Sequence, residues 1–516
     1  ALPTIGPAVD NGFYYDFANL HISESDLPKL EHKMRELLPS WEKFTYRSVS
    51  EKQAKELYKH NPFKLELIDE IIGRGEKLTL YTCGIFTDLC RGGHVEHPAK
   101  EIASDAFKLS SLAGTYWRGS EKNPQLTRIY GLAFASKKEL DEHLAQIEEA
   151  KKRDHRKLGK ELKLFSLIDE VGPGLPLFYP RGTMLRRIVE NFIAELQEKR
   201  GYQPIWIPHI TKGELYKISG HLDKYDALYP PMHLADESDP SDRSQAKVDY
   251  YLKPMNCPHF MMLYKQDQHS YRELPVRWTA TTTVYRYEKS GELAGLTRVR
   301  SLTQDDCHVF CAPDQIEMII NEMLDMVAEV YAAFGFRDFW VRVSTRDKKD
   351  SAKYIGDESV WKESEASLAR LIKARGWKHE EGAGEAAFYG PKLDFIFKDV
   401  IGRDWQLSTI QLDMNLPARF KLEYVADDGS KKQPVVIHRA ILGSTERFLG
   451  ILIEHFAGAF PVWLAPVQAR VIPVSEKTEK YAASVGQELQ KHGIRVQLDM
   501  SNETLGKRIR ASELEK

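Results

Sequence analysis

The sequence predicts an α+β protein built from several domains. Residues 277 to 310 alternate polar and apolar side chains, which is typical of strands joined by turns. Leu185 to Leu196 instead repeats apolar residues at the spacing of an amphipathic helix. From Arg470 onward the pattern is strand, helix, strand and the start of a helix, which indicates a parallel sheet. A chain of 516 residues has room for about two to four domains.

The composition limits the kinds of partner. Lys and Arg number 73 and Asp and Glu number 75, so the formal net charge is −2. A nucleic acid must therefore be bound by local basic patches and not by overall charge. The five cysteines are an odd number without a CxxC pair, and no apolar run approaches the roughly 18 residues of a membrane span. We expect a cytoplasmic protein with no membrane partner.

Three arginines and a glutamate gather in residues 277 to 310. The pattern predicts a strand, a turn and a returning strand, followed by a third strand. Arg286 and Glu288 would share one face of the first strand, and Arg298 and Arg300 one face of the second. Such guanidinium groups suit a phosphate-bearing substrate. A solvated hairpin with weak ion pairs explains the same residues equally well.

The third strand places polar groups on one face. Residues 304 to 311 alternate, so Asp306 and His308 lie opposite Cys307 and Cys311. A carboxylate and an imidazole on one face suggest a metal site close to the arginines.

A second group of reactive side chains lies in the first 135 residues. Asp88, Cys90 and His94 surround Gly92 and Gly93, which allow a ligand to approach the backbone closely. A Cys-x3-His pair is weak support for a metal, and a structural role is the alternative. The chain begins without methionine on a strand-like segment, so we expect that residues are missing upstream.

Residues 137 to 163 are predicted to form one long linking helix. Its second half, residues 151 to 163, has seven Lys or Arg against two acidic residues and could face a phosphate backbone or only solvent. Further on, Ile205 to Ile207 lies between two prolines, which favours an edge strand or a subunit contact. Residues 236 to 247 are polar and predict a surface loop.

The rest of the chain continues to mix helices and strands. Apolar periodicity predicts helices at 315–334, 364–374 and 439–460, and strands at 340–345 and within 387–412. Two parallel strands cannot form a stable buried sheet alone, so the last domain is expected to end early.

Five segments of the chain are distinctive. They are Lys253 to Pro258, Tyr285 to Glu288, Thr303 to His308, Phe388 to Lys392 and His438 to Arg447. Together these segments resemble those of a known family, the threonyl-tRNA synthetases of the bacterial type. The resemblance implies a class II synthetase core with an antiparallel sheet flanked by helices. It further implies a partial α+β editing domain (1–135), a helical linker (136–165), the core (166–464) and a partial α/β anticodon-binding domain (465–516), with truncation at both ends.

The resemblance implies that Cys257, His308 and His438 hold a zinc ion. Spacing alone would not group them, because 51 and 130 residues separate them. Three protein ligands leave a position open, as in functional zinc sites. In the family, the threonine amine and hydroxyl bind this metal. A site that engages a hydroxyl rejects the isostere valine by on the order of 10⁴-fold, whereas serine lacks only a methyl and requires editing.

The same resemblance implies an ATP site. It assigns Arg286 to the α-phosphate and the substrate carboxylate, Glu288 to the adenine end, Arg298 to the outer phosphates and Arg447 to the far side of ATP. Arg286 and Arg447 are therefore the implied catalytic residues, with Mg²⁺ accompanying ATP. Two further implied ATP-binding residues are Lys392 and Gln406.

The implied threonine-binding residues surround the zinc ligands. Asp306 resembles the partner of the hydroxyl and Tyr389 a contact of the amine. Gln406 and Gln411 are five residues apart, so a regular strand would send them to opposite faces, and a β-bulge is required if both reach the site. The remaining implied contacts are Gln304, Gln411 and Met255.

Two further sites follow from the resemblance. His221 resembles the histidine that assists transfer of threonine to the tRNA 3′ end. Asp88, Cys90 and His94 match one half of the family's editing site, with Gly93 where a proline is usual. The other half, an HxxxH pair from farther upstream, is absent from this sequence.

The favoured function is ATP-dependent attachment of threonine to tRNA(Thr) through a threonyl-adenylate, by a homodimer. An alternative is a synthetase-like RNA-binding protein without aminoacylation activity. A class II enzyme specific for proline or histidine is a further alternative.

Overall fold

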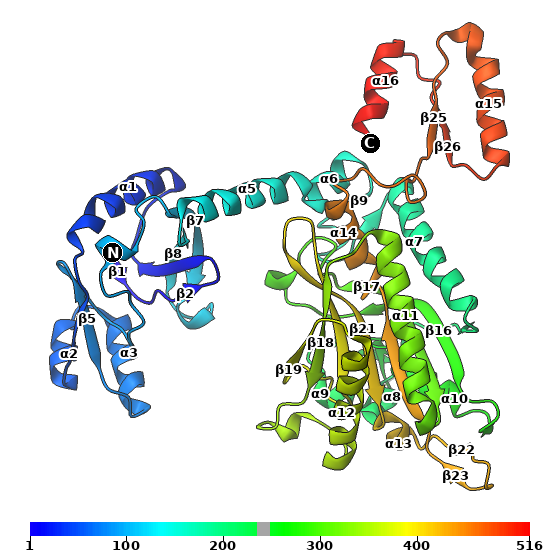
Figure 1. Ribbon diagram of the computed structural model, residues 1–516, viewed down its shortest axis with the longest axis horizontal. Coiled ribbons are helices and arrows are strands. Elements are labelled where there is room, and N and C mark those ends of the chain that lie inside the picture. Colours follow the sequence, from blue (N-terminus) through cyan, green and yellow to red (C-terminus); the bar gives the residue numbers. More distant parts are fainter. Residues whose placement is uncertain (235–247) are drawn as a thin grey trace. The chain divides into compact units, whose positions relative to one another are not determined.

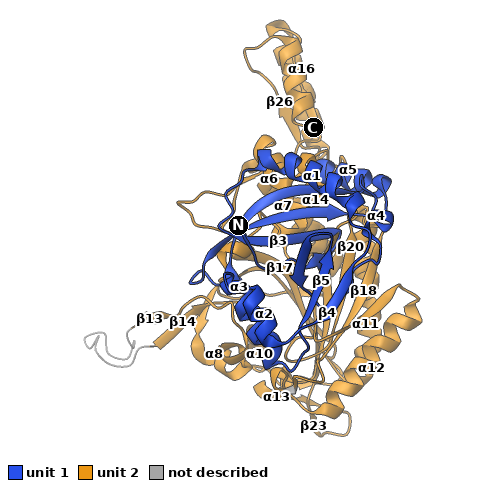
Figure 2. Cartoon of the chain, turned by 90° about the vertical axis from the view of Figure 1, so that its left-hand side faces the viewer, with its two compact units in different colours: residues 1–149 blue, residues 150–516 orange. Residues whose placement is uncertain are grey.

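The computed structural model describes residues 1–234 and 248–516. The loop predicted at 236–247 therefore lies outside the described residues. The chain folds as two compact units, residues 1–149 and residues 150–516, which have different colours in Figure 2. None of the described helices is long and apolar enough to cross a membrane.

The first unit contains two antiparallel sheets with helices beside them. The larger sheet runs in the order β1, β3, β8, β7, with β2 on β3, and α1 contacts β7. The smaller sheet, β4–β5–β6, carries Asp88 on its last strand. The elements are β1 (Leu2–Pro3), β2 (Ala8–Val9), β3 (Gly12–Ala18), α1 (Leu27–Leu37), β4 (Thr45–Ser48), α2 (Glu51–Leu57), α3 (Pro62–Gly73), β5 (Thr79–Cys83), β6 (Phe86–Leu89), α4 (Pro98–Glu101), β7 (Phe107–Tyr116) and β8 (Gln125–Ala133).

The predicted single linking helix is wrong, because it is divided at Asp154. Helix α5 covers Lys137–Arg153 and α6 covers His155–Glu161. Asp154 has a ψ of 118°, outside the helical region, and its side chain accepts a hydrogen bond from the backbone N–H of Arg156. A short polar side chain that caps a new helix competes with continuation of the preceding one.

The second unit is organised around an eight-stranded sheet in the order β11-β16-β17-β24-β21-β20-β18-β19. Strands β16, β17, β21, β18 and β19 of this sheet are labelled in Figure 1. The pairings from β16 to β18 are antiparallel, as predicted for the core, whereas β11 and β19 join the two edges in parallel. Its strands are β11 (Gln203–Pro204), β16 (Val276–Tyr285), β17 (Ser301–Cys311), β18 (Phe339–Thr345), β19 (His379–Ala383), β20 (Lys392–Lys398), β21 (Asp404–Asp413) and β24 (Val435–Ala440).

The sheet corrects two predictions. The expected returning strand with Arg298 and Arg300 is absent, because β16 pairs directly with β17 and residues 286–300 form a connecting loop with a short 3-10 helix, Ser290–Glu292, and an isolated bridge. The helix predicted from 439 is also wrong, because Arg439 lies on β24 and helix α14 begins at Thr445. Strand β24 is buried on both faces, so its sequence lacks the alternation that distinguishes a strand.

The two faces of the sheet have different roles. Cys307 and Cys311 of β17 point into the main apolar core with α7, α11 and α14, as the alternation predicts. On the other face, Phe310 packs with Cys257 and Phe260 of α10 in a second core. Between α6 and the end of the sheet region, the described helices of this unit are α7 (Pro180–Glu198), α8 (Gly213–Ser219), α9 (His221–Lys224), α10 (Cys257–Tyr264), α11 (Ile316–Phe334), α12 (Glu358–Arg375), α13 (Leu416–Phe420) and α14 (Thr445–His455).

The predicted strand–helix–strand–helix pattern at the end of the chain is confirmed. Strands β25 (Ala469–Val471) and β26 (Val496–Leu498) pair in parallel, with α15 (Glu479–Lys491) between them and α16 (Leu505–Leu514) after them. The short strands elsewhere in the unit are β9 (Phe165–Ser166), β10 (Leu177–Phe178), β12 (Ile210–Lys212), β13 (Met232–Leu234), β14 (Val248–Leu252), β15 (His269–Ser270), β22 (Tyr424–Val425) and β23 (Lys431–Lys432).

Candidate active site

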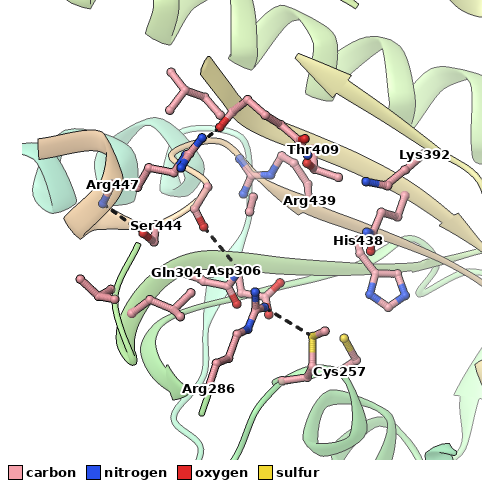
Figure 3. A pocket seen from close by; sticks show the side chains of 18 of the residues that line it. Cys257, Arg286, Gln304, Asp306, Lys392, Thr409, His438, Arg439, Ser444 and Arg447 are labelled. Atoms are coloured by element: carbon pink, nitrogen blue, oxygen red, sulfur yellow. Dashed lines mark hydrogen bonds between the residues drawn. The ribbon is translucent and has the colours of Figure 1, made fainter. Parts of the chain in front are cut away.

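A cavity of about 510 Å³ opens on the face of the sheet that carries α10 (Figure 3). It brings together most of the residues that the sequence singled out from distant segments. The predicted residues that line it are Met255, Cys257, Arg286, Glu288, Arg298, Gln304, Asp306, Tyr389, Lys392, Gln406, Gln411, His438 and Arg447. We call the part around Cys257 and His438 the Cys–His side, and the part around Arg286, Arg298 and Arg447 the arginine side.

The Cys–His side contains a compact group of metal-ligating atoms. One ligand atom each of Cys257, His308 and His438 lies within 4.8 Å of the others, and all three side chains are buried. Cys257 begins helix α10, while His308 and His438 are directly opposite each other on β17 and β24. Strand register thus joins two histidines that are far apart in the sequence. The predicted ligand set is geometrically able to hold one metal ion.

Neighbouring side chains fix the two imidazoles. His438 Nε2 lies 2.9 Å from Asp413 Oδ2, which leaves its Nδ1 without a hydrogen-bond partner. Among the described residues, neither ring nitrogen of His308 has a hydrogen-bond partner, although Asp306 Oδ1 lies 3.6 Å from its Nδ1, and the ring stacks on Phe260 at 4.1 Å between centroids. A carboxylate on the outer nitrogen of a histidine is the usual support of a metal ligand. Burial lowers the pKa of His308, so its imidazole is neutral and able to ligate.

A buried carboxylate lies beside this group. Asp306 accepts a hydrogen bond of 2.9 Å from Asn256 Nδ2, and its Oδ1 lies 3.6 Å from His308 Nδ1. Burial raises the pKa of Asp306 to about 6, although the Asn256 hydrogen bond opposes the shift. Tyr389 donates a hydrogen bond of 2.6 Å to Gln411 Oε1. These groups can recognise a small polar ligand next to the metal position.

On the arginine side, Arg447 is held by backbone carbonyl groups. Its Nε donates to Gln406 O at 3.0 Å and its Nη1 to Thr297 O at 2.9 Å (Figure 3 draws the first of these). The guanidinium also lies 5.3 Å from the Trp405 ring centroid. Burial and the nearby Arg298 lower its pKa, so a bound anion would relieve an unfavourable charge.

The other arginines lie on the 286–300 loop. Arg286 Nη2 is 3.8 Å from Met255 Sδ and its buried Nε has no hydrogen-bond partner among the described atoms. Arg298 pairs with Glu288 at 2.8 Å and with Glu292 at 2.6 Å, and its side chain is 49% exposed. Glu288 and Arg298 thus neutralise each other.

The predicted bulge in β21 is confirmed. Its register with β20 shifts between the pairs formed by Thr409 and Gln406, so Gln406, Thr409 and Gln411 all line the cavity. The buried Asp394 accepts hydrogen bonds from Thr409 and Gln406, and Lys392 Nζ lies 2.7 Å from it. This carboxylate therefore fixes three lining side chains at once.

His221 lies apart from these residues. It is fully buried at the start of α9 and does not line the cavity. Its Nδ1 is 2.8 Å from Ser219 Oγ, while its Nε2 has no partner among the described atoms. Burial lowers its pKa to about 3, so the ring is neutral. Its predicted part in transfer stays a prediction.

The second group, in the first unit, is not assembled as a metal site. Within the described residues, Asp88, Cys90 and His94 do not form a group with all ligand atoms within 4.8 Å. Asp88 instead accepts hydrogen bonds from Tyr15, Tyr58 and the buried Lys64, and His94 stacks on Phe44.

Several lining residues escaped the sequence analysis. Thr297, Thr409, Arg439 and Ser444 line the cavity, and Asp413 supports His438. Arg439 and Ser444 fall inside the quoted segment from His438 to Arg447, so that segment already contained a signal. Asp413 is 25 residues from His438, and only the pairing of β21 with β24 joins them.

Comparison with protein families agrees with this geometry. Residues 241–456 match the tRNA synthetase class II core domain (G, H, P, S and T). Residues 468–516 match the anticodon binding domain, and residues 78–130 match the threonyl and alanyl tRNA synthetase second additional domain. The fold and the site thus define a class II aminoacyl-tRNA synthetase.

Individual relatives narrow the class. The chain is 51% identical to a threonine–tRNA ligase of Rubrobacter xylanophilus, over 99% of this chain and 78% of the relative. It is 48% identical to a threonine–tRNA ligase of Thermus thermophilus, over 99% and 77% of the two chains. The chain belongs to the threonine–tRNA ligase family, enzymes that attach threonine to tRNA.

Solved structures give the same result. The RNA binding domain of threonyl-tRNA synthetase from Cryptosporidium parvum superposes with a TM-score of 0.65 at 39% identity, covering 70% of this chain and 87% of that one. A Giardia lamblia prolyl-tRNA synthetase shares the fold, with a TM-score of 0.54 at 16% identity over 72% and 68% of the chains.

Proposed function

We propose that the cavity binds threonine on the Cys–His side and ATP on the arginine side, and joins them as threonyl-adenylate. One observation carries the proposal. Cys257 and His438 line a single cavity with Arg286 and Arg447, and His308, which does not line it, has a ligand atom within 4.8 Å of theirs. A trio of soft and imidazole ligands suits zinc, and fixed guanidinium groups suit a phosphate.

The residues present fit a zinc ion. The imidazole nitrogens of His308 and the Nδ1 of His438 are buried without a hydrogen bond to any described atom, a costly arrangement that a metal would relieve. Burial raises the pKa of the Cys257 thiol well above its usual value, whereas a bound cation favours the thiolate. When bound, zinc would supply a Lewis-acid position for the threonine amine and hydroxyl.

Selection against valine then follows from polar groups left unpaired. Asp306 is the proposed acceptor of the threonine hydroxyl, held in place by Asn256. With valine bound, this buried carboxylate would face a methyl group and lose its partner. Serine keeps the hydroxyl, so Asp88, Cys90 and His94 of the first unit are the proposed partial site of its editing.

In the activation step, a threonine carboxylate oxygen forms a bond to the α-phosphorus of ATP while the bond to pyrophosphate breaks. Negative charge on the α-phosphate is stabilised by Arg286, and Arg447 and Arg298 hold the outer part of ATP. Glu288 is the proposed contact of adenine, and Mg²⁺ accompanies the phosphates. His221, which is buried and does not line the cavity, is proposed to assist the transfer of threonine to tRNA.

We also propose that the protein acts as a homodimer in the cytoplasm. Strand β11 lies at an edge of the large sheet, and Trp206 beside it is 79% exposed. An aromatic side chain on an open sheet edge suits a subunit contact. All five cysteines are free, which suits a reducing compartment. Sedimentation of Trp206→Arg would test the contact, since the proposal requires a shift toward monomer.

Pyrophosphate exchange tests the proposed function. Zinc-loaded protein is expected to exchange pyrophosphate into ATP with threonine, weakly with serine, and at background level with valine. Absence of threonine-dependent exchange would contradict the proposal. Exchange with proline or histidine in protein that holds no zinc would support a different specificity.

A further inference from the structure

A buried histidine of the linker contacts the 286–300 loop. His155, the first residue of α6, is 5% exposed and lies between α14 and this loop. Its Nδ1 is 2.6 Å from Glu454 Oε1, and the backbone N–H of Leu296 donates to its Nε2 at 2.9 Å. Among the described residues, Asp154, His155 and Glu454 also form the second group able to hold a metal. Both ring nitrogens of His155 already form hydrogen bonds, which disfavours a metal site at this group.

These contacts fix the tautomer of the ring. Because Nε2 accepts from a backbone N–H, the proton of the neutral imidazole must be on Nδ1, where it is donated to Glu454. Glu454 also accepts from the His155 backbone N–H at 3.1 Å and from Arg403. The carboxylate therefore orients the ring, and the ring presents one acceptor to the loop.

Two glycines allow the loop to approach the ring. A Cβ on Gly295 would lie 2.1 Å from His155 Nε2, and its φ of +53° is in the left-handed region. A Cβ on Gly450 of α14 would lie 3.3 Å from Leu296 Cβ and 3.6 Å from His155 Cδ2. The sequence thus keeps side chains out of the space where loop, ring and helix meet.

The anchored segment leads directly to the proposed ATP contacts. Leu296 is held by His155, and the next carbonyl, that of Thr297, accepts from Arg447. Arg298 follows, on the arginine side of the cavity. We infer that His155 is a positioning residue, which holds the 286–300 loop in the conformation that binds ATP. This inference rests on the proposed ATP site.

Two substitutions of His155 distinguish the contributions of its two side-chain hydrogen bonds. Gln at 155 can keep an acceptor near the Nε2 position, whereas Asn can keep a donor near the Nδ1 position but does not reach Leu296. Loss of one buried hydrogen bond predicts that His155→Asn raises the KM for ATP about five- to tenfold in threonine-dependent pyrophosphate exchange. In His155→Gln, the KM for ATP is expected to stay within about threefold of that of the unsubstituted protein. In both variants, the KM for threonine is expected to change less than about twofold.

Gly295→Ala tests the same contact without changing the ring. Its added methyl would push the loop from His155, so the KM for ATP is expected to rise at least about fivefold. Equal KM values for ATP in the Asn and Gln variants, or a parallel rise for threonine, would overturn the inference. The thermal midpoints of all variants show whether a change is global unfolding. Absence of exchange in the unsubstituted protein would contradict the proposed function itself. Exchange in the unsubstituted protein with unchanged KM values for ATP in the variants would contradict only the role of His155.

Discussion

The Cys–His side of the cavity is built on paired strands, whereas the arginine side depends largely on a loop. His308 and His438 are opposite each other on β17 and β24, and both are buried. Glu288 and Arg298 instead lie on the 286–300 loop, where Arg298 is half exposed and forms ion pairs. A metal site needs ligands held to a few tenths of an ångström, which strand register provides. A nucleotide is long, so it can be bound by loop side chains that change conformation on binding.

The largest effect is expected from removing a proposed zinc ligand of the Cys–His side. Cys257→Ser should lose bound zinc and lower threonine-dependent pyrophosphate exchange by about 10³-fold or more, because a site for the substrate amine and hydroxyl is lost. Metal analysis and exchange rates check this. Cys311→Ser, also a buried cysteine but on the opposite face, is the matched control. Full activity of Cys257→Ser without zinc would refute the role of the metal.

A smaller effect is expected from Arg447, the best anchored group of the other side. Arg447→Ala removes stabilisation of phosphate charge and should lower the exchange rate about 10²- to 10³-fold while zinc stays bound. The exposed Arg272, which lies over the ring of Tyr271, offers a control whose replacement by Ala should change little. Loss of zinc from Arg447→Ala would show that the two sides are not independent.

Replacing Asp413, which orients His438, is expected to have a smaller effect than removing a proposed zinc ligand. Asp413→Asn replaces the carboxylate on His438 Nε2 and should weaken zinc binding about 10- to 100-fold. Competition with a chelator measures this affinity. Zinc binding equal to that of the unsubstituted protein would mean that strand pairing alone orients the ring.

The smallest effect is expected from Glu292. Its ion pair with Arg298 is exposed, and such pairs contribute at most about 1 kcal/mol. Glu292→Gln should therefore change the KM for ATP less than about fivefold. The KM for ATP should be measured at low and at high salt, because screening at high salt should remove any difference between Glu292→Gln and the unsubstituted protein. A change of tenfold or more would show that this loop is as tightly specified as the strands.

The same contrast explains what the sequence could predict. Alternation correctly placed Asp306 and His308 on one face and Cys307 on the other, because it depends only on local geometry. The pairing of His308 with His438 depends on strand order and register across 130 residues, and only the resemblance suggested it.

The errors have local physical causes. The 286–300 loop has the alternation of a strand, but its conformation is set by contacts with His155 and Arg447, which no local pattern contains. The strand around Arg439 is buried on both faces and thus resembles an apolar helix.

The bulge in β21 lets one strand line both ends of the cavity. Gln411 meets the Cys–His side and Gln406 the region near Arg447, and both face the cavity only because one extra residue lies between them. Deletion of a single residue at 407 or 408 would remove the bulge and leave the two glutamines four residues apart in a regular strand, so both side chains would still face the cavity. The bulge therefore compensates for the odd spacing of the two glutamines in the sequence.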